Sequence, residues 1–378
     1  MRASLILLVL AAPAAARETV LVPIEDSTRF NLIAFLPLGL AKDAPGQVQW
    51  SHLIEHLIVT ATGPLPFDEV NAETLGDWMH LDYTRPAGTW REGVMKLGRW
   101  LGDTTFEEGA IRREIGRVAA EAEQVAADRA TQKFALAAWA HGVRHGATRV
   151  SVNGDLAKAT PEALRLAARS SRPPVVAVSG RFERDAVLEA LGAIELPKPH
   201  APPPDERVEP PERVAWDLPT SHDVLYLPLP ATTPRERALL AGVAPVLRMG
   251  WLPPPLLETD LDAGGRRWFV AVLPPGMPAD VDAVRALLAR LGTDPAWPRA
   301  VKAHLEARLA SRPFVAPLMG DRDVAEAYAA LEAGLHAFRY GDEAYAAALK
   351  DWDEAAVRRD VARLLDPKRL RLLRIVPE

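Results

Sequence analysis

Residues 50–59 read WSHLIEHLIV, and this stretch decides how the first half of the chain is interpreted. It contains no Gly or Pro, and its apolar residues recur at the spacing of a helix, so we expect a helix here. The other side of that helix carries His52, Glu55 and His56, with the two imidazoles one turn apart. One side carries only apolar side chains, namely Trp50, Leu53, Ile54, Leu57 and Ile58.

The polar side of this helix permits two interpretations. Two histidines at i and i+4 are the pair of nitrogen ligands that a zinc ion takes from one helix, and the adjacent Glu55 could act as an acid or base. The order is H-x-x-E-H, the inverse of the commoner H-E-x-x-H. An amphipathic helix with two histidines on its solvated face is the alternative, because short motifs also match by chance. A third ligand would decide between them.

The composition is that of a soluble globular protein large enough for two domains. The 378 residues are 48% hydrophobic and 25% charged, which argues against a disordered or fibrous chain. The formal net charge of -5 gives no general attraction to nucleic acid or anionic membranes, so we expect no nucleic-acid role. Cysteine is absent, so any metal must be held by His, Asp or Glu.

The N-terminus has the pattern of an export signal. Arg2 precedes the apolar run SLILLVLAAP, and Ala14-Ala15-Ala16 forms an A-x-A cleavage site. We expect residues 1–16 to be removed and the mature chain to be periplasmic or extracellular. A membrane anchor is the alternative, but the apolar run is too short to span a bilayer, and we expect no membrane span in the mature chain.

The segments around the first stretch alternate between strand and helix patterns. Residues 91–101 and 107–126 have helical spacing. Strands are expected where β-branched and apolar residues lie between polar turns, at TVLVPIE (19–25), NLIAFLPLGL (31–40) and MHLDYT (79–84).

The helix expected over 107–126 carries two carboxylates within its apolar stripe. Glu114 and Glu121 lie two turns apart, where a packed helix would normally carry leucine. A charge there is costly unless it is paired or binds a metal. Either both carboxylates lie at the margin of the stripe and reach solvent, or a carboxylate here completes a three-ligand zinc site with the histidine pair. The stripe itself consists of Ile111, Ile115, Val118, Ala122 and Val125.

These motifs together resemble the pitrilysin-like, or inverzincin, family of zinc metallopeptidases, which includes insulin-degrading enzyme and mitochondrial processing peptidase. HLIEH (52–56) matches the zinc motif, NAETLGDWMHLDY (71–83) resembles the N-A-x-T segment, and FEEGAIRREIGRVAAEAE (106–123) resembles the R-E-x-x-x-x-x-x-E helix. Residues 154–182 resemble the end of the family's first domain. The separation of His56 from Glu121 is shorter than usual and the double glycine before N-A-x-T is missing, which a trimmed loop would explain.

The resemblance implies a role for five residues. His52, His56 and Glu121 would bind one zinc ion per chain, Glu55 would be the general base, and Glu114 would be a supporting acidic residue. The implied fold is α+β, with two similar α/β domains in tandem, each a mainly antiparallel sheet covered by helices on one face. The implied substrate is an unstructured peptide that is added to a sheet edge as an extra strand.

A proline-rich stretch divides the chain, since seven of the seventeen residues 197–213 are proline, which favours an extended linker. Beyond it the order of elements recurs, without H-x-x-E-H. We therefore expect a zinc-binding catalytic domain at 17–196 and a second, non-metal-binding domain of similar topology at 214–378. The echoes are HDVLYLPLPA (222–231) of NLIAFLPLGL, 235–249 of the histidine-bearing helix, RRWFVAVLPP (266–275) of MHLDYTRP, and 280–292 with 298–310 of the later helices.

The function expected from these features is that of an exported zinc-dependent endopeptidase. The alternative is a non-catalytic or partner-dependent peptide-binding subunit of a heterodimeric peptidase. Members of the family carry an arginine and a tyrosine in the segment that matches 256–269, but here Trp268 stands near the tyrosine place and no arginine is suitably placed upstream. We therefore expect a heterodimer with a related exported subunit that supplies this Arg and Tyr.

Overall fold

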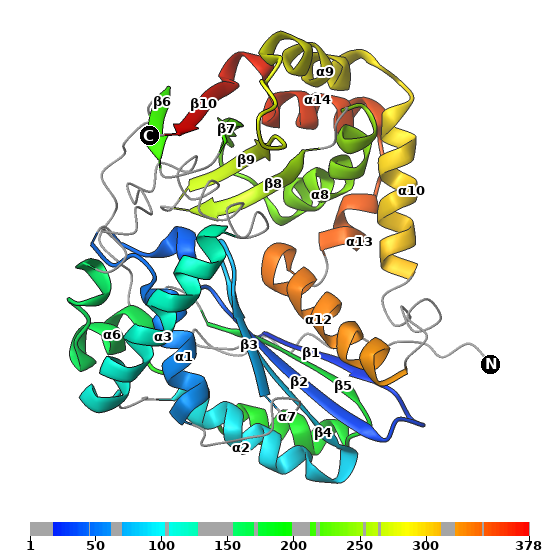
Figure 1. Cartoon of the computed structure of the whole chain (residues 1–378). Coiled ribbons are helices and arrows are strands. Elements are labelled where there is room, and N and C mark those ends of the chain that lie inside the picture. The colour runs from blue at the N-terminus through cyan, green and yellow to red at the C-terminus, as the bar shows by residue number, and fades with distance from the viewer. Residues whose placement is uncertain are drawn as a thin grey trace.

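Two five-stranded sheets form the framework of the protein in the computed structural model (Figure 1). The predicted signal segment 1–16 and most of the predicted linker 197–213 lie outside the described residues. The structure describes residues 18–44, 46–61, 70–102, 106–127, 154–169, 173–198, 212–216, 220–251, 255–263, 266–310, 322–341 and 344–377.

The first sheet has the strand order β1-β5-β2-β4-β3. β1 and β5 run parallel, whereas the other neighbouring pairs are antiparallel. β3 is therefore a terminal strand, paired with β4 on one side. The strands are β1 (Glu18–Pro23), β2 (Arg29–Leu36), β3 (Val70–Thr74), β4 (Met79–Pro86) and β5 (Val175–Gly180).

Helices of the first half cover one face of this sheet. Their apolar sides meet buried strand residues such as Leu32, Leu81 and Val178 in one continuous core. The helices are α1 (Trp50–Ala61), α2 (Trp90–Leu101), α3 (Glu108–Ala127), α6 (Pro161–Ala168) and α7 (Arg184–Gly192), with short 3-10 turns η1 (Leu40–Lys42) and η2 (Ala87–Thr89).

The second sheet repeats the first. Its order is β6-β10-β7-β9-β8, which is the same sequence of pairings, again with a parallel pair, β6 with β10. β2 and β7 thus correspond, as do β4 and β9, which are the echoes that the sequence predicts. The strands are β6 (Arg213–Trp216), β7 (His222–Pro228), β8 (Leu256–Ala263), β9 (Arg266–Val272) and β10 (Arg371–Pro377).

The helices of the second half pack on one face of the second sheet around a separate core. α8 takes the place of α1, and it begins with a capping box in which Thr233 and Glu236 satisfy each other's backbone N–H groups. The helices are α8 (Pro234–Met249), α9 (Val281–Thr293), α10 (Trp297–Ala310), α13 (Ala344–Leu349) and α14 (Glu354–Leu364), followed by the turn η3 (Pro367–Arg369).

One further helix, α12 (Arg322–Tyr340), comes from the second half but covers the opposite face of the first sheet. Figure 1 shows it, coloured orange, lying against β1, β2 and β5. Ala330 and Ala337 belong to the same buried cluster as Phe35 and Ala177, and the small residue Gly334 lets the helix approach these two sheet residues closely. The first sheet is therefore enclosed on both faces.

The predicted fold class is confirmed, with two similar α/β units in tandem. Two elements go beyond the prediction: residues 70–74 form a strand, and α12 crosses back onto the first sheet. Among the described residues, no helix is both long enough and apolar enough to cross a membrane.

Candidate metal centre

α1 is held in place at its first turn and along its apolar side. Asp43 accepts hydrogen bonds from the backbone N–H of Ser51 at 2.9 Å and from its hydroxyl at 2.6 Å, which satisfies groups that a helix N-terminus leaves open. The side chains that the sequence places on the apolar face are buried, including Leu53 and Leu57. His52, Glu55 and His56 are half-buried on the other side.

α3 packs beside α1 and brings the two carboxylates of its stripe to different environments. Ile111 and Val118 are buried and fix the face of α3 that points inward. The Glu114 side chain is only 1% exposed, whereas the Glu121 side chain is 48% exposed. Glu121 therefore reaches solvent, whereas Glu114 does not, and the alternative in which both carboxylates reach solvent is wrong for Glu114.

Three side-chain atoms from these two helices form a triangle. The Nε2 atoms of His52 and His56 are 3.2 Å apart, and Glu121 Oε2 lies 3.3 Å from the first and 3.4 Å from the second. A tetrahedral zinc ion with ligand distances of about 2.0–2.1 Å separates its ligands by about 3.3 Å. The donor types and separations therefore fit zinc, and the group could hold a metal ion.

The second nitrogen of each histidine also has a partner. Nδ1 of His56 lies 3.2 Å from Glu114 Oε2, and Arg117 in turn donates to Glu114 at 3.1 Å. Nδ1 of His52 lies 2.9 Å from Gln49 Oε1. Such contacts orient metal ligands and choose the nitrogen that carries the proton. Gln49 and Arg117 were not expected to belong to the site, although the first lies one helical turn before His52 and the second one turn after Glu114.

The electrostatic environment keeps the site receptive to a cation. Burial and the neighbouring His56 lower the pKa of His52 to about 4, so His52 is neutral at physiological pH and keeps a lone pair for a metal. Burial also raises the pKa of Glu55, although the neighbouring side chain of Thr74 on β3 partly opposes this shift. Glu55 therefore binds a proton more readily than an exposed glutamate does.

A second group of ionisable side chains lies on the other face of the sheet, which α12 covers. His80 of β4 is nearly buried, with Nδ1 2.6 Å from Asp82 Oδ1 and Nε2 3.2 Å from Glu73 Oε2. Burial alone would lower the pKa of His80, but the two carboxylates together outweigh it and raise the pKa to about 9. The cluster is thus an ion network that links the buried His80 of β4 to the exposed Glu73 of β3.

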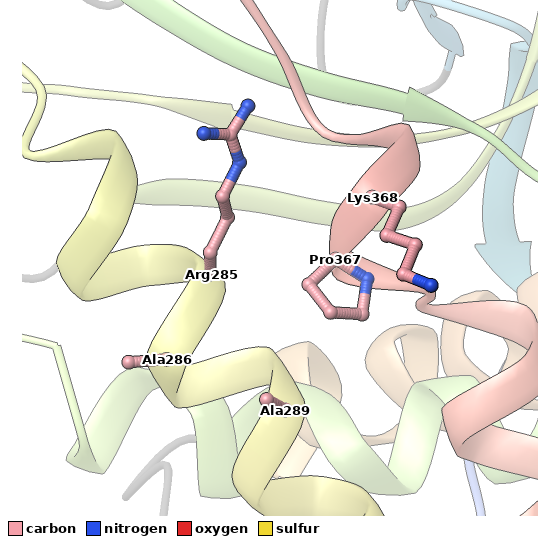
Figure 2. Close-up of a pocket in the computed structure, with 5 residues that line it drawn as sticks. All are labelled: Arg285, Ala286, Ala289, Pro367 and Lys368. Carbon is pink, nitrogen blue, oxygen red and sulfur yellow. The ribbon is translucent and has the colours of Figure 1, made fainter.

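The pocket shown in Figure 2 lies in the second half of the chain, and its lining differs chemically from the candidate metal centre. Its volume is about 560 Å³, and it is lined by Arg285, Ala286, Ala289, Pro367 and Lys368. The basic side chains of Arg285 and Lys368 extend from α9 and η3. Its lining contains neither a carboxylate nor an imidazole, so it offers no general base and no metal ligand.

No protein-family profile matches this chain, and no curated protein does. Solved structures do match over nearly the whole length. A protein from Alicyclobacillus acidocaldarius assigned as an M16-like peptidase has a TM-score of 0.66 at 14% identity, covering 98% of this chain and 100% of that chain. An inactive M16 peptidase domain from Pseudomonas fluorescens has a TM-score of 0.63 at 14% identity, covering 96% of each chain.

The first half of the periplasmic protease PqqL from Escherichia coli is also similar, with a TM-score of 0.56 at 15% identity, covering 95% of this chain and 90% of that chain. This chain therefore has the M16-like, or pitrilysin-like, peptidase fold. Fold likeness at such identities does not establish activity, because one fold carries both active and inactive members.

Proposed function

We propose that the protein is an exported zinc-dependent endopeptidase that cleaves unstructured peptides. The observation that carries the proposal is the triangle of His52, His56 and Glu121, whose separations of 3.2–3.4 Å fit a tetrahedral zinc ion, with Glu55 on the same helix as both histidines. Zinc in such a site supplies a Lewis acid that polarises the scissile carbonyl and activates water.

Glu55 acts as the general base in this proposal. Its carboxylate takes a proton from the attacking water and passes it to the leaving amine. Burial raises the pKa of Glu55, which brings its proton affinity closer to that needed for exchange near neutral pH.

Glu114 supports the site without binding the ion. Its buried carboxylate accepts a hydrogen bond from Nδ1 of His56, which leaves the lone pair of the other imidazole nitrogen for zinc. Arg117 offsets the negative charge that burial would otherwise penalise.

The peptide substrate is recognised along β3, the last strand of the first sheet among the described residues. β3 is a terminal strand of that sheet and packs against α1, so a peptide added beside β3 would run past the metal centre. Backbone hydrogen bonds along a strand recognise any extended chain, which predicts loose sequence preference.

The neighbour named as the first half of a periplasmic protease favours a two-part enzyme and an exported location. Trp268 is completely buried, so it cannot offer a polar group to a substrate as a tyrosine hydroxyl would. We therefore propose a heterodimer with a related subunit that supplies the missing Arg and Tyr. We also propose that residues 17–196 and 214–378 are two domains joined through 197–213, with α12 of the second domain packed on the sheet of the first.

The alternative function, a peptide-binding subunit without its own catalysis, is favoured by the neighbour described as an inactive domain. Turnover of a mixture of unstructured peptides separates the two, measured for the chain alone and with candidate exported partners. We expect weak cleavage alone and strong cleavage with the partner. Glu55→Gln should keep zinc but lower the rate by roughly 10²-fold or more.

The matched control for Glu55→Gln is Glu92→Gln, which changes a carboxylate on the exposed side of α2 and should leave the rate unaltered. Equal rates for Glu55→Gln and the parent protein would refute the role of Glu55. Full turnover by the isolated chain, unchanged by any partner, would refute the heterodimer and leave the endopeptidase standing.

A further inference from the structure

Gln49, the residue immediately before α1, has an unusual backbone conformation. Its φ is 67°, in the left-handed region that favours glycine. Among the described residues, the non-glycine residues with positive φ are Gln49 and Asp351. A glutamine in this conformation is disfavoured relative to glycine, so its side chain is expected to compensate through a contact that glycine could not make.

The main-chain contacts of this turn do not require a glutamine. The carbonyl oxygen of Gln49 accepts the hydrogen bond from Leu53 N–H at 2.9 Å, which begins the helix. Asp43 accepts hydrogen bonds from the backbone N–H and the hydroxyl of Ser51, in the first turn of α1. Glycine at position 49 could make the same backbone bond at no steric cost. The presence of glutamine rather than glycine at position 49 must therefore be explained by the contacts of its side chain.

That side chain reaches the metal centre. Gln49 Oε1 lies 2.9 Å from His52 Nδ1, and an amide oxygen is only an acceptor, so Nδ1 must carry the imidazole proton. Nε2 of His52 then has the free lone pair, and Nε2 is the atom that faces His56 and Glu121. In the left-handed conformation, the side-chain amide of Gln49 lies beside Nδ1 of His52, three residues later in the chain.

We propose that Gln49 is a positioning residue that fixes the tautomer and ring orientation of His52 for zinc. The inference rests on the proposed zinc site and adds to it a residue that binds neither metal nor substrate. The two histidines are then oriented by different chemistries, His56 by the carboxylate of Glu114 and His52 by a neutral amide. The neutral amide orients its histidine without adding a second buried negative charge.

The test exploits opposite effects of the backbone and the side chain at position 49. Gln49→Gly relieves the left-handed strain, so the zinc-free protein should melt at a higher temperature. The same change removes the acceptor for His52, so zinc affinity, measured by competition with a chelating dye, should fall about 10- to 100-fold. If Gln49 had a purely structural role, its replacement could not raise the melting temperature and lower the zinc affinity together.

Two further variants complete the experiment. Gln49→Glu keeps an acceptor of the same reach, so zinc affinity should stay within about threefold of the parent. Asp351→Gly relieves the other left-handed non-glycine residue, so it should raise the melting temperature with no change in zinc affinity. The visible spectrum of the cobalt-loaded protein, which reports ligand geometry, should change in Gln49→Gly and not in Asp351→Gly.

The outcomes are distinguishable. Unchanged zinc affinity in Gln49→Gly would overturn the role of Gln49 while the zinc site stands, and so would a parallel loss of melting temperature and affinity. A parent protein that binds no zinc under the same conditions would overturn the proposed function and this inference together.

Discussion

His80 should make the stability of this protein depend on pH in the alkaline range. Both ring nitrogens of His80 face carboxylate oxygens, at 2.6 Å from Asp82 and 3.2 Å from Glu73, so the folded protein favours the doubly protonated imidazolium. Burial by itself would lower the pKa of His80, but these two partners raise it to about 9 from an ordinary value of 6.5.

The sign of the effect follows from the proton balance. Between pH 6.5 and 9 the folded chain holds a proton on His80 that the unfolded chain has lost, so folding is stabilised below this window and loses that stabilisation as pH rises through it. Each pKa unit corresponds to about 1.4 kcal/mol, and the full shift would give roughly 3 kcal/mol. Glu73 is 59% exposed and its attraction is screened by water, so we expect on the order of 2 kcal/mol.

The assay is urea unfolding of the zinc-free protein at several pH values from 6 to 9.5. The parent should be more stable than His80→Gln at pH 6, and this advantage should shrink by about 2 kcal/mol by pH 9.5. His304→Gln is the matched control: burial and Arg308 lower the pKa of His304, whereas the pKa of His80 is raised, so replacing His304 should preserve the alkaline loss. A parent advantage over His80→Gln that stays constant with pH would refute the reasoning.

Two further predictions concern α12 and Glu114. In Gly334→Ala the new methyl group would lie 2.7 Å from the Cβ of Ala177 on the first sheet, so α12 must shift; we expect a loss of about 2–3 kcal/mol, seen as a lower melting temperature in calorimetry. Glu114→Gln should weaken zinc binding about tenfold by disturbing His56, whereas the exposed Glu108→Gln should not; equal affinities in a chelator competition would contradict this.

The sequence predicted well where local periodicity and burial agree. α1 forms where the apolar residues of 50–59 recur at helical spacing, and its apolar face is buried. The repeat of the sheet order followed from the similar patterns of NLIAFLPLGL and HDVLYLPLPA, which became the corresponding strands β2 and β7. In these segments the local preference and the tertiary environment favour the same structure.

The elements that escaped prediction depend on contacts between distant parts of the chain. β3 contains Asn71, Ala72 and Glu73, residue types that are uncommon in strands, and it forms through its pairing with β4. α12 was not predicted, and its alanine-rich face does not reveal that its partner is a sheet more than a hundred residues earlier. The left-handed conformation of Gln49 cannot be predicted from the sequence, because that conformation is typical of glycine, asparagine or aspartate.

For the candidate site, the sequence supplied the residue types, and the structure supplies their relation in space. The resemblance named His52, His56 and Glu121 together, and these residues do meet at one point between α1 and α3. Their assignment as zinc ligands stays a prediction. The orienting contact of Gln49 became visible only from atomic distances.

The most direct test of the central claim is the zinc content of the purified protein by elemental analysis. We expect about one zinc per chain in the parent and in the His304→Ala control, which removes a histidine on α10 away from the triangle. We expect no retained zinc in His56→Ala, because two donors of the triangle cannot hold the ion through purification. Full zinc occupancy in His56→Ala, or a parent protein that takes up no zinc, would contradict the account.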